Sequence, residues 1–161
     1  MKEIVCFHNP DEINGYLSNW YCSEFEIKGT TFSSMEQYMM YSKAKVFGDE
    51  AIAAQIMQNS NVAVIKNLGR LVSGYDDKVW DGMRQIIVYE GLLAKFSQNE
   101  ELKEQLLATG DATLAECAVA DIIWGIGLDM KDEKRYDVSK WKGRNLLGYS
   151  LMLVRDKLAG M

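Results

Sequence analysis

A series of amphipathic segments between residues 33 and 110 constrains the fold more than any other feature of the sequence. Each segment places apolar side chains at the spacing of an α-helix. Short stretches with Gly, Ser, Asn or Asp separate the segments, and these residues favour helix ends. We expect helices over residues 33–47, 49–58, 61–72, 78–98 and 100–110. In the longest of them, the side chains expected to point inward are Val79, Met83, Ile86, Ile87 and Leu93.

Short strands are expected on either side of these helices. Residues 4–7 have the pattern of a strand, and residues 24–32 that of a hairpin that turns at Lys28 and Gly29. Residues 112–119 fit a buried strand or the start of a loop. Residues 120–144 have an irregular pattern, and a closing helix over 145–158 follows. Ser60 and Asn145 are expected to begin the helices that follow them. The sequence thus predicts an α+β fold, a predominantly helical single domain over residues 1–161 with a small β-sheet.

Composition excludes several classes of protein. The chain has 161 residues, of which 48% are hydrophobic and 25% charged, as in ordinary globular domains. It has no apolar run near the roughly 20 residues of a membrane span, and its N-terminus lacks the apolar core of a signal peptide. We therefore expect a cytoplasmic protein without a membrane partner. The net charge of −5 argues against a broad electrostatic grip on nucleic acid.

Metal and disulfide chemistry is not expected either. The cysteines Cys6, Cys22 and Cys117 are far apart and odd in number, which favours small buried thiols over a disulfide framework. His8 is the single histidine, and a zinc site normally needs several His or Cys ligands. No spacing typical of a calcium loop is present. We predict no metal and no cofactor.

Glu36 and Lys43 share one face of the helix expected over residues 33–47. They are seven residues apart, so they lie within about 20° on the helical wheel and about 10 Å apart along the axis. Met40 and Phe47 make this face partly apolar, so the two charges could line the ends of a cleft. Two structural alternatives remain open. Glu36 could complete a capping box with Ser33, and Lys43 could be a surface lysine.

The stretch LAECAVADIIWGIG, residues 114–127, places two carboxylates among apolar residues. Burial raises the pKa of a carboxyl group, which suits a general acid. The alternative is that each carboxylate caps a turn or pairs with an arginine. Trp124 and Gly125 offer an aromatic face beside backbone that a ligand can approach closely, although a tryptophan is commonly part of a core.

Other polar residues suit a ribose or a phosphate. Asn19 in LSNW, residues 17–20, and Arg70 in Gly69-Arg70 are candidates of this kind. Arg144 and Asn145 open the last helix, where unpaired N–H groups could bind an anion. No Walker loop, GxGxxG, GxSxG or HExxH motif is present, and nothing in the sequence points to a triad built on His8.

Several of these stretches together resemble the NADAR (YbiA-like) family. The matching pieces run in family order from about residue 16 to 158, and they include YLSNWYCSEFEIKGTTFSSMEQYMMYSKAKVFGD, LGRLV, VWDGMRQIIVYEGLLAKFSQN, LLATGDATLAECAVADIIWGIGL and WKGRNLLGYSLMLVRDKL. The resemblance implies an enzyme that hydrolyses the N-glycosidic bond between a ribose and a base-like nitrogen. It implies two activity groups: removal of ADP-ribose from modified guanine, and cleavage of early riboflavin-pathway intermediates, the ribosylamino-pyrimidine phosphates.

The resemblance also assigns residues. The family motif S-x-E-x-x-x-x-x-x-K falls on Ser34, Glu36 and Lys43, and it implies attack on the sugar C1 by the lysine and proton transfer by the glutamate. The second motif places Asp121 and Trp124 at the site. Ile126 stands where some members have an acidic residue, which weakens an assignment to the riboflavin-type branch. The catalytic prediction is therefore Glu36, Lys43 and Asp121, with Ser34 and Glu116 in support. The predicted substrate-binding residues are Ser18, Asn19, Trp20, Arg70, Trp80, Trp124, Gly125 and Asn145.

The expected partner is a substrate that contains ADP-ribose or a ribosyl phosphate, either free or as ADP-ribosylated nucleic acid. A binding module that recognises ADP-ribose or NAD without cleaving it is the competing class, and a purely structural partner protein is a third. The pairing of Glu36 with Lys43 argues for the enzyme, because recognition alone does not require a nucleophile.

Overall fold

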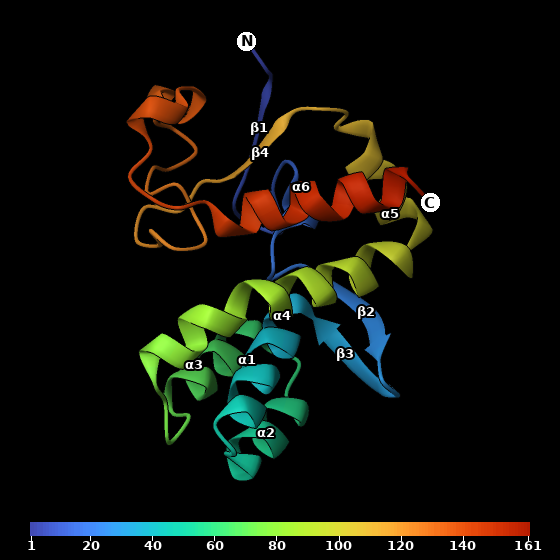
Figure 1. Ribbon diagram of the computed structural model, residues 1–161, viewed down its shortest axis with the longest axis vertical. Coiled ribbons are helices and arrows are strands. Elements are labelled where there is room, and N and C mark those ends of the chain that lie inside the picture. Colours follow the sequence, from blue (N-terminus) through green and yellow to red (C-terminus); the bar gives the residue numbers. More distant parts are fainter. The chain divides into compact units, whose positions relative to one another are not determined.

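The computed structural model describes residues 1–161 and separates them into two units, each with its own contacts. One unit is the continuous segment Cys22–Gln98. The other combines Met1–Tyr21 with Asn99–Met161. The helices and strands of each unit are shown in Figure 1.

A β-hairpin opens the unit Cys22–Gln98. Strands β2 (Cys22–Ile27) and β3 (Thr30–Ser34) are antiparallel, with Phe25 opposite Phe32. The connecting residues Lys28 and Gly29 have φ values of 51° and 82°. Positive φ at both central positions of a two-residue turn matches the right-handed twist of the flanking strands. Glycine adopts such a φ at little cost. The hairpin predicted over residues 24–32 is confirmed, including its turn.

The helices of this unit are α1 (Met35–Val46), α2 (Glu50–Met57), α3 (Val62–Arg70) and α4 (Asp77–Ser97). Helix α1 packs against each of the other three (Figure 1). An aromatic cluster joins α1 to the hairpin, since the ring centroid of Tyr38 lies 6.0 Å from that of Phe25 and 5.0 Å from that of Phe32. Edge-to-face contacts of this kind stabilise a core beyond the area that they bury.

Two sequence predictions for these helices are wrong in detail. Helix α3 is capped by Asn61 and not by Ser60, because the Asn61 Oδ1 accepts hydrogen bonds from the amides of Ala63 and Val64. In α4, Val79, Met83 and Ile86 are exposed by 44%, 42% and 63%, Leu93 is half-buried, and only Ile87 of the expected inward residues is buried. The face that is buried runs through Trp80, Arg84, Ile87, Val88, Gly91, Leu92, Lys95 and Phe96.

Packing against α1 explains which face of α4 is buried. A Cβ atom on Gly91 would lie 2.5 Å from Tyr38 Cδ1 and 2.7 Å from Met35 Cε, so the missing side chain allows α4 to approach α1 closely. Polar and small residues such as Arg84, Gly91 and Lys95 therefore lie on the buried side. A pattern that counts only apolar residues selects the opposite face of the helix.

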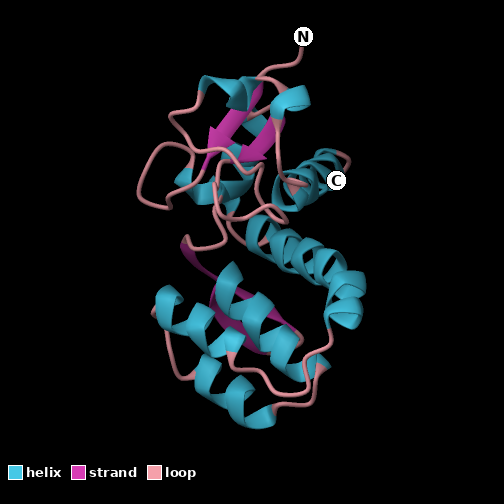
Figure 2. Ribbon diagram, turned by 90° about the vertical axis from the view of Figure 1, so that its left-hand side faces the viewer, coloured by secondary structure: helices cyan, strands magenta, loops and turns pink.

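The second unit contains a short parallel sheet. Strands β1 (Ile4–Phe7) and β4 (Thr113–Glu116) pair side by side, with Cys6 opposite Ala115 and Phe7 opposite Glu116 (Figure 2). Helices α5 (Glu100–Ala108) and α6 (Leu146–Ala159) belong to the same unit, and α6 packs against β4. The strand predicted over residues 4–7 is confirmed, and the strand alternative holds for the first half of residues 112–119.

Residues 117–145 are mostly irregular, as predicted for 120–144. They contain only two short 3-10 helices, η2 (Glu133–Tyr136) and η3 (Val138–Lys140), while η1 (Gly15–Leu17) lies near the N-terminus. Side chains of this segment complete the core beside the sheet, where Ile126 and Leu128 are buried with Cys6, Ala115 and Cys117.

The α+β, mostly helical class is confirmed, with one difference. The strands form two separate two-stranded sheets in place of one small sheet. None of the helices combines the length and the apolar character that a membrane span requires.

Candidate functional site

The first turn of α1 decides between the two interpretations of Glu36. The helix begins at Ser34, whose Oγ accepts a hydrogen bond of 3.1 Å from the Gln37 amide. The Gln37 Oε1 in turn accepts a hydrogen bond of 2.7 Å from the Ser33 amide. Ser34 and Gln37 therefore form the capping pair, one residue later than the Ser33–Glu36 pair considered from the sequence. The capping alternative for Glu36 is wrong, although its side chain is buried, with the residue only 5% exposed.

Lys43 is half-buried, which contradicts the surface-lysine alternative. Its Nζ donates a hydrogen bond of 2.8 Å to the Gly69 carbonyl and lies 4.7 Å from the centre of the Tyr75 ring. Burial lowers the pKa of Lys43 below its ordinary value, Glu36 opposes this change, and Arg70 adds to it. A lysine in such surroundings is neutral more often than a solvated one, as a nucleophilic amine must be.

Tyr75 is part of this environment, and sequence reasoning missed it. Its ring centroid lies 5.3 Å from that of Phe47, and its hydroxyl donates a 2.9 Å hydrogen bond to Asp77 Oδ1. Burial and the Asp77 carboxylate raise the pKa of Tyr75. The stretch SGYDD signals only a turn, so the sequence carried no sign that its tyrosine would cover Lys43.

Arg70 acts on Lys43, and Arg84 acts on Tyr75. Arg70 is exposed and donates a hydrogen bond of 3.2 Å to Asn67 Oδ1. Its positive charge helps to lower the pKa of Lys43. Arg84 is buried and forms an ion pair with Asp81, and its Nε has no hydrogen-bond partner. Its positive charge opposes the rise in the pKa of Tyr75. Arginine is well suited to phosphate because its planar donors can bind two oxygens together. Trp80, one of the predicted substrate-binding residues, is buried, with 5% of its surface exposed.

Asp121 lies in the second unit and shapes its own loop. Its Oδ1 accepts hydrogen bonds from the amides of Ile123 at 3.0 Å and Trp124 at 2.8 Å. Asp121 therefore caps a turn through its Oδ1, as the structural alternative expected. Its side chain is only half-buried. Trp124 is half-buried as well, and Gly125 is buried. A catalytic role for Asp121 stays a prediction.

The start of α6 does not offer an open anion site. The amides of Arg144, Asn145, Leu146 and Leu147 donate to the carbonyls of Ile122, Gly125, Ile123 and Trp124, respectively, at 2.8 to 3.2 Å. The loop 122–125 therefore occupies the donors expected to face an anion, and that prediction is wrong. Glycine is required for this close approach, because a Cβ on Gly143 would lie 2.2 Å from the Gly125 carbonyl oxygen.

Asn145 holds this loop to β4 and does not cap α6 through its side chain. Its φ of 52° is left-handed and its side chain makes no capping hydrogen bond. Instead its Oδ1 accepts from the Glu116 amide at 3.1 Å, and its Nδ2 donates to the Leu114 carbonyl at 2.9 Å. The residue is fully buried, so the structure supports a positioning role, and contact with a ligand remains a prediction.

Glu116 pairs with a histidine, not with an arginine. Its Oε1 lies 2.8 Å from the Nδ1 of His8, a residue that sequence reasoning set aside. Burial raises the pKa of Glu116, and the hydrogen bond to Glu116 raises the pKa of His8. The contact depends on the register of β1 and β4, which lie more than 100 residues apart in the chain, so no local pattern could reveal it.

The segment LSNW lies in the same unit as Glu116. The Ser18 Oγ accepts a hydrogen bond of 3.1 Å from the Trp20 amide. Asn19 is 7% exposed, and its Oδ1 is buried without a hydrogen-bond partner, which is the state expected of a group that awaits a ligand or a water. Binding of substrate by these residues stays a prediction.

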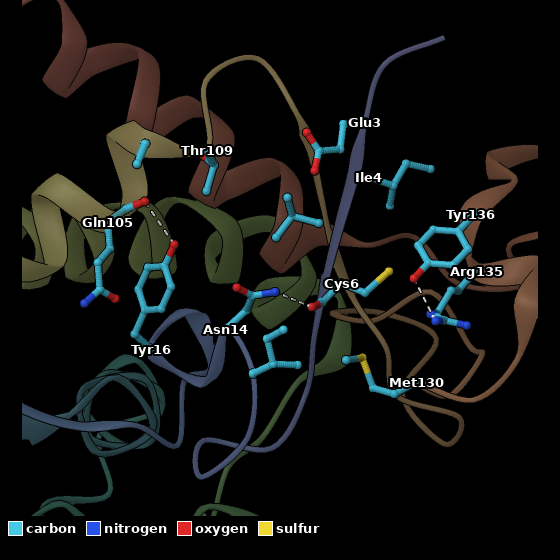
Figure 3. Close-up of a pocket in the computed structure, with 13 residues that line it drawn as sticks. Glu3, Ile4, Cys6, Asn14, Tyr16, Gln105, Thr109, Met130, Arg135 and Tyr136 are labelled. Carbon is cyan, nitrogen blue, oxygen red and sulfur yellow. Dashed lines mark hydrogen bonds between the residues drawn. The ribbon is translucent and has the colours of Figure 1, made fainter.

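A groove of about 820 Å³ lies along β1 in this unit, and none of the predicted site residues lines it. Figure 3 shows Tyr16 and Gln105 on one side of β1 and Arg135 and Tyr136 on the other. The Tyr16 hydroxyl donates to the Gln105 carbonyl, and Asn14 donates to the Cys6 carbonyl. These two side chains therefore bind main-chain carbonyls of the same unit.

No cluster of three or more His, Cys, Asp or Glu side chains is arranged to hold a metal ion. Cys6, Cys22 and Cys117 are free thiols, the first and last of them buried.

Comparisons with known proteins identify the family. The model of the NADAR domain matches residues 6–159. The chain is 41% identical to N-glycosidase R617 of Acanthamoeba polyphaga mimivirus, over 96% of each chain. It is 32% identical to N-glycosidase YbiA of Escherichia coli strain K12, over 97% of this chain and 89% of YbiA. It is also 32% identical to the riboflavin biosynthesis protein VVA0006 of Vibrio vulnificus, over 98% of this chain but 39% of that protein.

The fold agrees with a solved relative. The NMR structure of E. coli YbiA superimposes with a TM-score of 0.81 at 32% identity, covering 98% of this chain and 86% of that one. Relatives named as N-glycosidases agree with the enzyme class expected from the sequence, a hydrolase of N-glycosyl bonds. On a match that spans nearly the whole chain, this protein belongs to the NADAR domain family.

Proposed function

We propose that this chain hydrolyses the N-glycosidic bond between a ribose and a base-like nitrogen, and that its substrate is guanine modified with ADP-ribose. We further propose that residues 1–161 act as one NADAR-type domain, because the family match covers residues of both units. The observation that carries the reaction type is the environment of Lys43, a half-buried amine with a lowered pKa that lies under the electrostatic influence of Glu36.

The mechanism follows from the charge that develops during cleavage. As the bond to the base breaks, the sugar C1 becomes positive, like an oxocarbenium ion. The neutral Lys43 amine attacks C1 and holds it as a Schiff base while the sugar ring is open. Glu36 moves the protons for ring opening and for hydrolysis of the adduct. Asp121 binds ribose hydroxyls or serves as a second acid–base group.

Arginine side chains support a substrate with a diphosphate. Arg70 acts electrostatically on Lys43, and Arg84 acts on the Tyr75 ring that covers it. Two guanidinium groups near the proposed nucleophile fit the diphosphate of ADP-ribose better than a single phosphate. The proposed substrate-binding residues remain Ser18, Asn19, Trp20, Arg70, Trp80, Trp124, Gly125 and Asn145.

Ribosylamino-pyrimidine phosphates are the second candidate substrates. The Vibrio relative named as a riboflavin biosynthesis protein favours them. Against them stands Ile126, which is fully buried in the core beside Cys6 and Cys117 and offers no acidic group after Trp124 and Gly125.

A release assay tests the proposal. The chain is incubated in parallel with ADP-ribosylated guanosine, NAD and a ribosylamino-pyrimidine phosphate, and the liberated sugar and base are separated by chromatography. We expect ADP-ribose and guanosine as the products from the first substrate, at a rate well above that with the other two. Preference for the pyrimidine would move the chain to the riboflavin branch. A ligand-induced thermal shift without any cleavage would identify a binding module.

The same reactions with sodium borohydride test the role of Lys43. Reduction of a Schiff base should fix the opened sugar on Lys43, detectable by mass spectrometry of the digested protein, and should stop turnover. Lys43→Arg, which keeps the charge but cannot form the adduct, serves as the control. Normal turnover without an adduct on Lys43 would exclude the covalent step.

A further inference from the structure

Two of the three cysteines lie together on one face of the parallel sheet. Cys6 of β1 stands opposite Ala115 of β4, and Cys117 follows two residues later. Side chains two residues apart on a strand point to the same face of a sheet. The Cys117 amide donates a hydrogen bond of 2.8 Å to the Phe7 carbonyl, which keeps residue 117 in line with β1. The register of the sheet thus brings together two thiols that are far apart in the chain.

The two thiols are in contact but not bonded. Both are buried in the cluster that also contains Ile126 and Leu128, and the side chains of Cys117 and Cys6 form a hydrogen bond. Neither belongs to a disulfide. A disulfide needs a sulfur–sulfur distance of about 2.05 Å, so the sulfurs must move closer for a bond to form. Cys117 directly follows the last residue of β4, where the strand gives way to an irregular loop that can accommodate this movement.

Only one of the two thiols can be reached from outside. Cys6 lines the groove of about 820 Å³ along β1, and Cys117 does not. Figure 3 shows the sulfur of Cys6 on the side of β1 that faces Arg135 and Tyr136. Cys6 is 7% exposed and Cys117 1%. A small molecule in the groove therefore meets the sulfur of Cys6 first, with that of Cys117 behind it.

The surroundings also separate the acidities of the two thiols. The hydrogen bond with Cys117 lowers the pKa of Cys6, Arg135 adds to this, and burial opposes it. The hydrogen bond with Cys6 raises the pKa of Cys117, and burial and the charge of Glu116 add to that rise. The thiolate is the form of cysteine that reacts with peroxides and other electrophiles. Cys6 is thus the reactive member of the pair, with a neutral thiol beside it.

Arg135 is held at the groove by its own hydrogen bonds. Its Nη2 donates a bond of 2.7 Å to the Tyr136 hydroxyl, and its Nη1 donates one of 3.0 Å to the Asp132 carbonyl. A guanidinium group stays charged at every physiological pH. A fixed positive charge therefore acts on the sulfur that the groove exposes.

We propose that Cys6 and Cys117 are a redox-active thiol pair, in which a peroxide that enters the groove oxidises Cys6 and Cys117 converts the product into a reversible disulfide. Every residue involved belongs to the unit of Met1–Tyr21 and Asn99–Met161, and the inference does not depend on the proposed glycosidase reaction. Such a bond forms and breaks with the redox state, unlike the permanent disulfide framework that the cysteine count argues against.

Both steps balance with hydrogen peroxide as the oxidant. The Cys6 thiolate attacks one peroxide oxygen, the O–O bond breaks, and the departing hydroxide takes up a proton and leaves as water. Cys6 is then a sulfenic acid. The Cys117 sulfur attacks the Cys6 sulfur, the S–O bond breaks, and the oxygen leaves as a second water with the proton of Cys117. Two thiols have lost two electrons, and one peroxide has been reduced to two waters.

Mass spectrometry of the oxidised chain tests the pair. Cys22→Ser is the starting chain, because Cys22 is exposed and could cross-link two molecules. The chain is reduced, freed of reductant, treated with hydrogen peroxide, alkylated in denaturant and digested. We expect a peptide pair joined through Cys6 and Cys117, which dithiothreitol separates again, and an intact monomer that has lost two hydrogens. Peroxide treatment that leaves both thiols open to alkylation would overturn the proposal.

Single substitutions in the same chain test the role of each sulfur. In Cys117→Ala, oxidation should stop at a sulfenic acid on Cys6, which dimedone traps. In Cys6→Ala, Cys117 should stay reduced and dimedone should add to nothing. Oxidation of Cys117 in Cys6→Ala as fast as in the starting chain would overturn the assignment of Cys6. Sulfinic acid on Cys6 of the starting chain, with Cys117 still reduced, would overturn the role of Cys117.

Comparison with the unfolded chain needs neither of these substitutions. In urea the disulfide should form more slowly than in the folded chain, because the contact between the thiols is lost. An equal rate would show that the fold contributes nothing and would overturn the pair.

The pH dependence of alkylation tests the action of Arg135. In the folded starting chain, the rate at which iodoacetamide modifies Cys6 should reach half its maximum below about pH 8.5, the ordinary value for a thiol. Arg135→Gln should move this midpoint to higher pH. Lys134→Gln, which removes a charge from the same 3-10 helix, is the matched control and should leave the midpoint in place. Equal midpoints in the two variants would overturn the role of Arg135.

Discussion

At the start of α1, the hydroxyl of Ser34 and the side chain of Gln37 make the capping hydrogen bonds, so the carboxylate of Glu36 is not used for this purpose. Glu36 is nevertheless buried and acts electrostatically on Lys43. Burying a carboxylate away from water has a cost in stability. The position of Glu36 beside Lys43 is the one that the proposed proton transfer requires.

Glu36→Gln should therefore affect the reaction more than the fold. We expect kcat to fall at least about 10²-fold, because a neutral amide cannot transfer protons. The melting temperature should stay near that of the wild type, because the two side chains have the same shape. Ser34→Ala is the comparison, and it should lower the melting temperature by roughly 2–4 °C through a loss of about 1 kcal/mol of capping. Normal turnover in Glu36→Gln with a lowered melting temperature would contradict this assignment.

Residues at helical spacing were the part of the site that sequence alone could predict. Glu36 and Lys43 share a face because the helix repeats every 3.6 residues. Tyr75 and His8 could not be found in this way. Their contacts with Lys43 and Glu116 depend on how α1 meets the turn before α4 and on the register of β1 with β4.

At the scale of elements, two helices meet at Gly69. A Cβ atom there would lie 2.0 Å from Met40 Sδ and 2.9 Å from Met40 Cγ, so the missing side chain lets α3 lie close to α1. The same close approach brings the Gly69 carbonyl to the Lys43 amine at 2.8 Å. One glycine thus sets both the packing of the helices and the position of the proposed nucleophile.

Gly69→Ala should force the buried Met40 side chain to move, with a consequence for both stability and activity. Crowding of this kind costs about 1–3 kcal/mol, more than the helical preference of alanine returns. We expect a lower midpoint in urea unfolding and a lower kcat, because crowding at residue 69 displaces the main-chain carbonyl that accepts from the Lys43 amine. Gly82→Ala in α4 is the matched control: a Cβ there meets nothing within 4 Å, so it should stabilise the chain by up to about 1 kcal/mol. Stabilisation by both substitutions would contradict the tight contact.

The element patterns show where sequence reasoning succeeds. The hairpin at Lys28 and Gly29 and the helix order follow from local rules of turns and periodicity. The buried face of α4 does not, because Gly91 and Arg84 lie on it for reasons of packing against other elements. Whether the strands form one sheet or two also depends on pairing between distant segments.

At the scale of the whole molecule, charge limits the substrate. The chain carries 18 basic and 23 acidic residues, a net charge of −5. Such a chain repels a long polyanion except near basic side chains such as Arg70, which acts on Lys43, and Arg84, which acts on Tyr75. Binding should therefore depend on the phosphates of one modified nucleotide and hardly on those of its neighbours in a nucleic acid.

The salt dependence of cleavage tests this limit. In a plot of log kcat/KM against log salt concentration, each phosphate contact to a single strand contributes a slope of about −0.7. We expect a slope no steeper than about −2, the value for two or three contacts. ADP-ribosylated guanosine and the same nucleotide within a single-stranded oligonucleotide should give similar slopes. Arg70→Gln should flatten both slopes by about one contact. A much steeper slope for the oligonucleotide would show that the protein binds the flanking strand, and that its net charge does not exclude an extended nucleic-acid surface.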